Sequence, residues 1–365
     1  MSRRIEIDAL RGLMLVTMTL THLPTRLRLY SDQPFGFVSA AEGFVFLSAF
    51  VVAAGWSRQV ATRGAHHAGQ RLRARALRVY GHHLALLAFA FTVAATLAAA
   101  GGRPGLRNLL GFYFEFPGVA LLSGPLLLYQ PPLLDILPMY VVFLALTPAL
   151  LKWTERRGFG ALWVASAALW LFAQCDGRAL LHSGLRELTG VPLPLDALGA
   201  FDLLAWQLLW LAGLWAGATR GERFQKPALF WVSVLAVAGF AFWRHKLAGF
   251  TFDLGARAAL LDKWHLGALR VVNFVTLAIV MARGALPLLR AARADVLSRL
   301  GRASLPVFTV HVLGCLVSLA LVNDEVTALS VSEEAAVLIA TFGAMALVAW
   351  RATLARPVAG LGVRG

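Results

Sequence analysis

The chain has 365 residues, a formal net charge of +15 at pH 7 and a hydrophobic content of 59%, with only 15% charged residues. No soluble domain of this length needs so much apolar surface, and apolar runs of bilayer-spanning length recur along the whole chain. The composition therefore predicts an all-α polytopic membrane protein that forms one domain over residues 1–365. Membrane topology explains most of the basic excess, so binding to nucleic acid is not expected.

Ten apolar segments are predicted to span the membrane as a transmembrane helical bundle. They cover 9–28, 38–57, 79–100, 133–151, 160–176, 201–219, 227–243, 266–283, 305–322 and 335–351. The segment 101–132 is also apolar, but prolines such as Pro117 and Pro125 interrupt it. A re-entrant or interfacial segment suits it better than a clean span.

The distribution of Lys and Arg predicts the orientation of these spans. Of the 34 such residues, 23 lie in the two termini and in the loops 58–78, 152–159, 220–226 and 283–304, and only 10 lie in the opposite loops. The loop 323–334, on that opposite side, has four acidic residues and no basic one. Because cytoplasmic loops carry an excess of Lys and Arg, both termini are predicted to be cytoplasmic.

Two ionisable residues, Arg11 and His22, lie in the first predicted span. They are eleven positions apart, about three helical turns, so their side chains share one face of the helix. An arginine in the middle of a membrane costs roughly 2.5–3.5 kcal/mol on insertion scales, so a cavity or the bundle interior should receive it. Hydrogen bonding between helices is one interpretation. A functional site is the other, and it is favoured for His22.

Two acidic residues are candidates to serve this pair. Asp8 lies three residues before Arg11 and is expected to make a local ion pair with it, which need not be more than structural. Glu42 lies near the outer end of the second predicted span. It is expected to pair with a cation of the first span or to orient His22 by accepting its ring N–H. An interfacial carboxylate in water is the alternative for Glu42.

A run of arginines lies at the entry to the third predicted span, in QRLRARALRVY. It consists of Arg71, Arg73, Arg75 and Arg78. Arg75 and Arg78 are neighbours on a helix and form a fork that suits phosphate groups. Topology explains the run equally well, because basic residues flank the cytoplasmic ends of many spans.

Other polar residues in apolar surroundings are weaker candidates. His311 is the second intramembrane histidine, and a lone histidine on an apolar helix is more often a hydrogen-bonding residue than a catalyst. Trp206 and Gln207 are candidates for a sugar site, although tryptophan is also an interfacial anchor. Asp262 and Lys263, in the segment LLDKWH, are candidates for contact with a polar acceptor.

Familiar cofactor motifs do not occur in this sequence. There is no Walker loop, dinucleotide fingerprint, nucleophile elbow or zinc signature, so an ATPase or a dehydrogenase is not expected. The two cysteines, Cys175 and Cys315, do not have metal-ligand spacing, and no metal site is predicted.

Seven blocks in this order resemble a known family. They are RRIEIDALRGLMLVTMTLTHLP, SAAEGFVFLSAF, RLRARALRVYGHHLALL, QPPLLDILPMYVVFLALTP, LLAWQLLWLAGLWAG, LLDKWHLGALRVVNFVTLA and LSRLGRASLPVFTVHVL. Together they resemble the OpgC family, the succinyltransferases of osmoregulated periplasmic glucans, within the wider acyltransferase-3 group. The resemblance extends from Arg4 to about His311. The ordered series is specific, whereas any single block would be weak.

The resemblance implies roles for several of the residues above. Arg11 and His22 match an Arg-x10-His pattern of the wider group, which implies that His22 is the catalytic base. Arg75 and Arg78 match an Arg-x-x-Arg pattern implied to serve acyl-CoA, and Glu42 matches an acidic position before the FVFLS block.

The sequence departs from the family pattern at two positions. Asn273 stands where the pattern has a histidine, so it is left out of the catalytic set. Ala49 stands where related sequences carry glycine, which affects helix packing at most.

The function implied by the resemblance is transfer of an acyl group, succinyl above all, from cytoplasmic acyl-CoA to a hydroxyl of a periplasmic glucan. The enzyme would lie in the bacterial inner membrane and use acyl-CoA as a co-substrate without a tightly bound cofactor. His22 would act as general base, with Glu42 or Asp8 holding its tautomer and Arg11 stabilising the oxyanion or positioning His22.

Several alternatives stay open at this point. A covalent acyl-histidine relay would use the same residues. Acetyl transfer to another envelope polysaccharide would use the same machinery. A transporter of glycans or anions also buries Arg and His in the membrane, although no inverted repeat is evident. An inactive protein that retains the fold is a further alternative. The sequence does not predict the oligomeric state.

Overall fold

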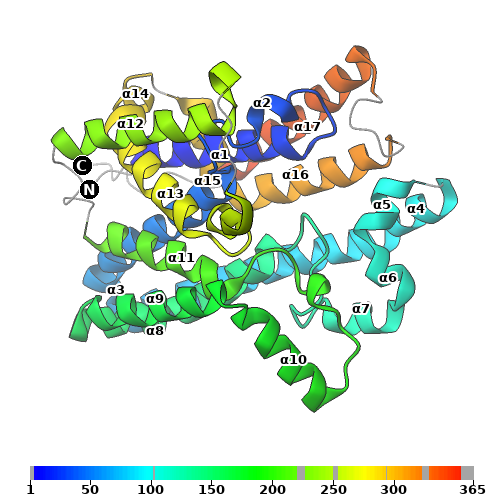
Figure 1. Cartoon of the computed structure of the whole chain (residues 1–365), viewed down its shortest axis with the longest axis horizontal. Coiled ribbons are helices and arrows are strands. Elements are labelled where there is room, and N and C mark those ends of the chain that lie inside the picture. Colours follow the sequence, from blue (N-terminus) through cyan, green and yellow to red (C-terminus); the bar gives the residue numbers. More distant parts are fainter. Residues whose placement is uncertain are drawn as a thin grey trace, which may run out of the picture.

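The computed structural model describes residues 4–101, 103–219, 227–249, 254–292, 294–322 and 329–354. Every regular element in these ranges is helical, and none is a strand, so the predicted all-α class is confirmed for the described chain. Figure 1 shows α3, α8, α9 and α11 together in one half of the molecule, and α1 with α12 to α17 in the other.

The helices have the following bounds. They are α1 Ile5–His22, α2 Arg28–Ser31, α3 Ala40–Phe89, α4 Ala95–Gly101, α5 Pro104–Leu109, α6 Gly111–Glu115, α7 Pro117–Ser123, α8 Ile136–Arg157, α9 Gly160–Gln174, α10 Gly177–Thr189, α11 Leu203–Ala218, α12 Pro227–Arg244, α13 Ala268–Val280, α14 Leu286–Ala291, α15 Asp295–Arg302, α16 Ser304–Leu319 and α17 Val331–Leu354. Short 3-10 turns occur at Leu195–Leu198 (η2), Leu247–Gly249 (η4) and Gly255–Leu261 (η5). Single π-helical turns occur at Ala90–Ala94 (η1) and Met281–Ala285 (η6).

Six helical stretches in the described residues are long and apolar enough to cross a membrane, or seven if the bent pair α15 and α16 is one span. Each of the ten predicted spans coincides with a helix, but α1, α9 and α16 do not meet that criterion alone. The number of spans and the cytoplasmic termini therefore stay predictions. Part of the charge argument concerns 1–3, 220–226, 323–328 and 355–365, which lie outside the described residues.

The longest helix, α3, joins the second and third predicted spans without the loop expected at 58–78. Its 50 residues would extend for about 75 Å, more than twice the thickness of a hydrocarbon core. Gly64, with φ of 81°, divides it into two helical segments. The expected loop was wrong because its many Ala, Arg and Gln residues have high helix propensity.

The segment 101–132 is broken, as its prolines predict. It forms the three short helices α5, α6 and α7, and Pro104 and Pro117 occupy first-turn positions where a missing N–H costs nothing. An irregular stretch follows α7, in which Leu127 and Leu133 have positive φ. The chain therefore cannot cross here as one regular helix.

Close backbone contact joins α1 to α15. A Cβ atom added to Gly12 would collide with the carbonyl oxygen of Leu297, and one added to Gly301 would collide with that of Asp8. Glycine is required at this crossing because any side chain would force the two helices apart. Beyond the crossing, the chain bends by 89° between α15 and α16.

Substitution of either glycine should separate these helices. We expect Gly12→Ala and Gly301→Ala each to lower stability by about 1–3 kcal/mol through overpacking. Thermal unfolding of the detergent-solubilised protein measures the effect. Gly343→Ala in α17 is the matched control, because open space surrounds that position, and it should leave the unfolding temperature unchanged or slightly raised.

Candidate functional site

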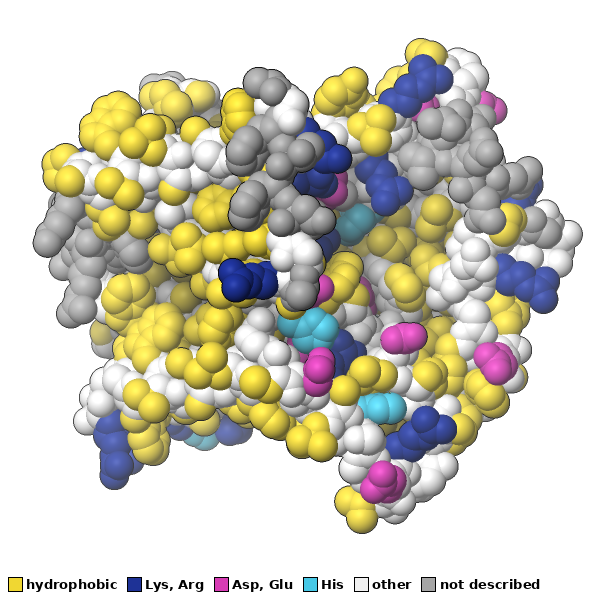
Figure 2. Space-filling model, in the orientation of Figure 1, with side chains coloured by type: hydrophobic (Ala, Val, Ile, Leu, Met, Phe, Trp, Pro, Cys, Tyr) yellow, Lys and Arg dark blue, Asp and Glu magenta, His cyan; other side chains and the backbone are white. Residues whose placement is uncertain are grey.

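A cavity of about 630 Å³ lies at the end of α1 that carries His22, and we call it the His22 cavity. Its walls come from α1, the start of α3, the segment 130–136, the start of α10, the turn η2 and the loop 262–265. Its polar lining residues are Thr21, His22, Ser39, Gln130, Asp135, Asp176, Arg178, Asp196, Lys263 and His265. In Figure 2, acidic, basic and histidine side chains gather near the middle of one face, among hydrophobic ones.

His22 and His311 meet at this cavity. His22 Nδ1 lies 3.2 Å from His311 Nε2, and the two rings stack with centroids 5.3 Å apart. His311 is completely buried, and its Nδ1 lies 3.6 Å from Cys315 Sγ. His22 itself lines the cavity, so a row of polar atoms runs from the cavity wall into the core.

Arg11 occupies the other end of the same helix face. Its guanidinium donates to the carbonyl of Gly301 over 3.1 Å and to Ser304 Oγ over 2.6 Å, at the bend between α15 and α16. Asp8 lies 3.9 Å from it, in the predicted local ion pair. Because eleven residues of helix rise about 16 Å, Arg11 and His22 do not act on the same atom from α1.

The face of α1 that carries Arg11 and His22 therefore packs against α16. Arg11 bonds to the start of α16, and His22 bonds to a residue further along it. Interhelical hydrogen bonding, one of the two interpretations of the pair, is thus correct for both residues. For His22 it does not exclude chemistry, because the bond uses only one of its two ring nitrogens and the residue also lines the cavity.

Glu42 pairs with Arg270 rather than with His22 or a cation of α1. Arg270 Nε donates to one carboxylate oxygen over 2.6 Å, and both groups are almost completely buried. The other oxygen accepts from Ser39 N in a capping box that begins α3. The expectation that Glu42 orients His22 is therefore replaced by a buried ion pair between α3 and α13.

Arg270 was missing from the residues selected by sequence. It lies inside the predicted span 266–283, where a charged side chain requires a partner. That position was the one signal that could have selected Arg270. Its partner could not be found from the sequence, because nothing there places α13 beside the start of α3. A second residue of α13, Asn273, accepts from Phe37 N over 2.7 Å and so holds the loop before α3.

The arginine run lies on the part of α3 that follows Gly64. Arg71, Arg73 and Arg78 are exposed, and Arg75 is half-buried. Arg75 and Arg11 both lie within electrostatic range of Tyr140 on α8. Arg75 therefore lies on the side of the bundle that carries Arg11, about three helical turns of α1 from His22.

The predicted acceptor residues divide into two groups. Trp206 is fully buried and donates to the carbonyl of Trp264. Gln207 bonds to the side chain and backbone of Ser166. These contacts favour packing roles for Trp206 and Gln207 over contact with a sugar.

Asp262 and Lys263 are the second group, and both line cavities. Asp262 accepts from the backbone and ring of His265, which fixes the loop, and Lys263 lines the His22 cavity. Lys263 Nζ lies 4.6 Å from the ring centroid of Trp264.

Further polar residues of the cavity come from segments that the sequence did not connect. Asp135 accepts from Ala200 N over 3.1 Å, and Arg178 donates to the carbonyl of Gly199. Both hold the turn η2 against the cavity. In the described part of the chain, no group of three or more His, Cys, Asp or Glu side chains is arranged to hold a metal ion.

The buried pair of Glu42 and Arg270 gives a stability prediction. Glu42→Gln should destabilise the protein by about 3–5 kcal/mol, because it leaves a buried guanidinium without its counter-charge. Thermal unfolding in detergent measures this. Combining Glu42→Gln with Arg270→Met should recover part of the loss, and Glu115→Gln, at an exposed carboxylate, should have little effect. Equal stability of Glu42→Gln and the wild type would contradict the assignment.

Three comparisons relate this chain to known proteins. A family model described as OpgC protein matches residues 3–356, nearly the whole chain. Comparisons with curated proteins and with solved structures each found no match. The family match agrees with the resemblance seen in the ordered sequence blocks, whereas membership of the wider acyltransferase-3 group stays a prediction.

Proposed function

The chain belongs to the OpgC protein family, whose members are membrane-associated acyltransferases, and from this premise we propose its reaction. The protein moves an acyl group, succinyl above all, from cytoplasmic acyl-CoA to a hydroxyl of a periplasmic glucan. It acts as one integral-membrane domain of ten spans in the bacterial inner membrane, with both termini cytoplasmic. The family match supports acyl transfer, and the arrangement around His22 supports the choice of base.

The observation that carries the proposal is the bond between His22 and His311 at the wall of a polar cavity. In the proposed tautomer, His22 Nδ1 donates its proton to His311 Nε2, which lies 3.2 Å away, and His311 Nδ1–H faces Cys315 Sγ at 3.6 Å. This tautomer leaves His22 Nε2 unprotonated and able to accept the proton of a hydroxyl. His311 thereby takes the orienting role that the sequence suggested for Glu42 or Asp8.

The reaction then needs one base and no acyl group bonded to the enzyme. His22 Nε2 removes the proton of the glucan hydroxyl while the hydroxyl oxygen attacks the carbonyl carbon of the thioester. The tetrahedral intermediate collapses, the C–S bond breaks, and the CoA thiolate takes the proton from His22. An acyl-histidine relay is the variant in which His22 Nε2 itself attacks the thioester.

The donor is proposed to enter at the end of the bundle that carries the arginine run. Arg71, Arg75 and Arg78 share one helix face at spacings of four and three residues, so they can bind the phosphates of CoA together. Arg73 lies on the opposite face and contributes charge at most. Arg11, held at the bend of α15 and α16, positions α16 and thus His311.

The acceptor is proposed to enter at the other end, beside the loop 262–265. Asp262 and Lys263 lie there, and Trp264 is partly exposed. An exposed tryptophan beside polar side chains can cover a sugar ring, the role that the sequence suggested for Trp206. Acetyl transfer to another polysaccharide would use the same two entrances, and analysis of the glycans made with and without the gene separates these products.

Removal of the base tests the reaction directly. His22→Ala should lower the rate of acyl transfer by roughly 10²–10⁴-fold, the usual contribution of a general base. The assay follows transfer from succinyl-CoA to glucan by the protein reconstituted in membranes. His66→Ala, at an exposed histidine on α3, is the control. Transfer near the wild-type rate by folded His22→Ala protein would exclude this mechanism.

The orienting role of His311 has a separate readout. His311→Leu should lower kcat by roughly 10–100-fold, the equivalent of one hydrogen bond to a group that becomes charged. The KM for acyl-CoA should stay unchanged because the substitution leaves the arginine run intact. His311→Gln, which keeps an acceptor, should retain more activity and a pH profile closer to that of the wild type. Equal loss in both variants would indicate a purely structural role.

A further inference from the structure

A second cavity, which we call the cation cavity, adjoins the His22 cavity. It measures about 480 Å³, and Arg244, Lys246, Lys263 and Arg270 line it together with the amide of Gln33. Asp262 is its one acidic lining residue among those described, and three aromatic side chains complete the wall. Lys263 and Trp264 line both cavities, so these two residues form the partition between them.

Arg270 has a donor group that the described protein leaves unused. Its Nε binds Glu42 and its Nη1 donates to the carbonyl of Leu261. Its Nη2 is buried and has no hydrogen-bond partner among the described residues. A buried donor without a partner is costly, and such groups usually have one in native proteins. An acceptor atom supplied by a ligand would satisfy it.

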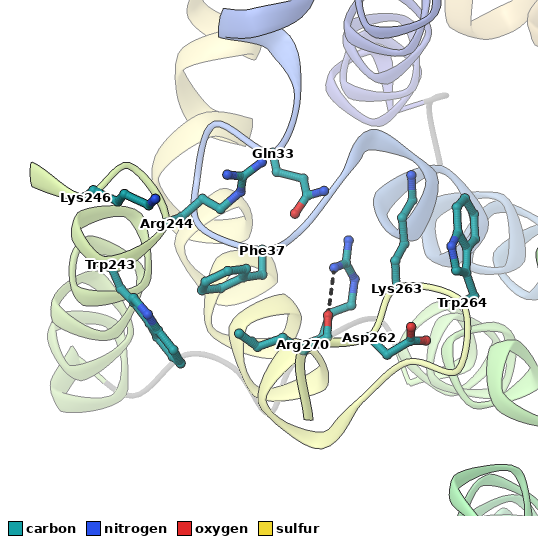
Figure 3. Close-up of a pocket in the computed structure, with 10 residues that line it drawn as sticks. Gln33, Phe37, Trp243, Arg244, Lys246, Asp262, Lys263, Trp264 and Arg270 are labelled. Carbon is teal, nitrogen blue, oxygen red and sulfur yellow. Dashed lines mark hydrogen bonds between the residues drawn. The ribbon is translucent and has the colours of Figure 1, made fainter. Parts of the chain in front are cut away.

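Several polar side chains that line the cation cavity lie around a shared space. Figure 3 shows the guanidinium of Arg270 and the amide of Gln33 facing this space, with Lys263 on one side and Arg244 on the other. Glu42 pairs with Arg270 and Asp32 with Arg244, so Lys246 and Lys263 leave an excess of positive charge over Asp262, which favours a negatively charged group here. Arginine in particular binds the planar or tetrahedral oxygens of carboxylate and phosphate.

The wall of the cation cavity is held by contacts between distant segments. Arg244 bonds to Asp32, and His245 lies 3.2 Å from the carbonyl of Pro34, so the end of α12 is tied to the loop before α3. Gln33 and Lys246 have positive φ, of 55° and 51°, which non-glycine residues rarely adopt. Such conformations are retained where the surrounding structure demands them, often at binding sites.

We propose that the cation cavity is an anion subsite, which binds a carboxylate or phosphate carried by one of the two substrates of transfer. The inference rests on the proposed acyl transfer for the identity of those substrates. Lys263 joins the subsite to the chemistry, because it lines both cavities and acts electrostatically on His22. The anionic group is either the distal carboxylate of a dicarboxylic acyl donor or an anionic substituent on the acceptor glucan.

Kinetics with matched substrates distinguish these two sources. Succinyl-CoA is compared with butyryl-CoA, which has nearly the same shape and lacks the carboxylate. A neutral glucan is compared with the same glucan carrying a carboxylate or phosphate ester. The variants are Lys246→Gln, at an exposed rim position, and Lys263→Gln. Arg186→Gln, which removes one exposed charge from α10 away from both cavities, is the control.

A donor-side subsite predicts that each variant raises KM for succinyl-CoA by roughly 10-fold and leaves KM for butyryl-CoA unchanged. An acceptor-side subsite predicts the same loss for the anionic glucan alone. Arg186→Gln should change neither preference. Unchanged discrimination for both substrate pairs in both variants would overturn the proposal.

Direct binding keeps this test separate from the test of acyl transfer. Succinate and inorganic phosphate are titrated into the full-length protein while its unfolding temperature is measured. Stabilisation by either anion that is weakened in Lys246→Gln and retained in Arg186→Gln supports the subsite, even if the protein transfers no acyl group. No stabilisation by either anion in the wild type overturns the subsite, and the result of His22→Ala is then unaffected.

Arg270 is probed in a form that keeps the buried charges balanced. Arg270→Gln alone would leave the buried Glu42 carboxylate without its counter-charge, so it is combined with Glu42→Gln. The double variant should lose the anion-dependent stabilisation while it still unfolds cooperatively. Full retention of that stabilisation in the folded double variant would contradict the role of Nη2.

Discussion

The packing of α1 against the bent pair α15 and α16 is the constraint on which the rest of the site depends. Glycines at the crossing bring the two backbones together, and the Arg11 guanidinium bonds across the bend. These contacts set the direction of α16, and that direction places His311 beside His22. Because a helix is stiff, a small change at the Arg11 end would be transmitted over three turns to the pair of histidines.

A buried ion pair performs a similar task at the start of α3. Glu42 begins α3 through its capping box and at the same time holds Arg270 of α13. Two charges in an apolar interior are costly to separate, so the start of α3, the loop before it and α13 form one unit. Both cavities border this unit. Local stability and the shape of the candidate site therefore depend on the same few contacts.

The two ends of the bundle differ in chemistry. The arginine run, Arg11 and Tyr140 gather at one end, whereas His22, Lys263 and the loop 262–265 gather at the other. Such separation suits a reaction whose donor and acceptor are proposed to arrive from opposite sides of a membrane. In the proposed reaction, the acyl group of the donor meets the acceptor hydroxyl at the histidine pair.

Sequence periodicity and composition by themselves determined the all-α class, the positions of the apolar helices and the broken character of 101–132, because these depend on local hydrophobicity and on proline. They also selected Arg11, His22 and Glu42 as polar residues in costly surroundings. Only the tertiary structure decided their partners: His311 for His22, Arg270 for Glu42, and the bend of α15 and α16 for Arg11. Each of these contacts joins residues more than 200 positions apart, and a partner at that separation depends on how helices pack, which no local pattern encodes.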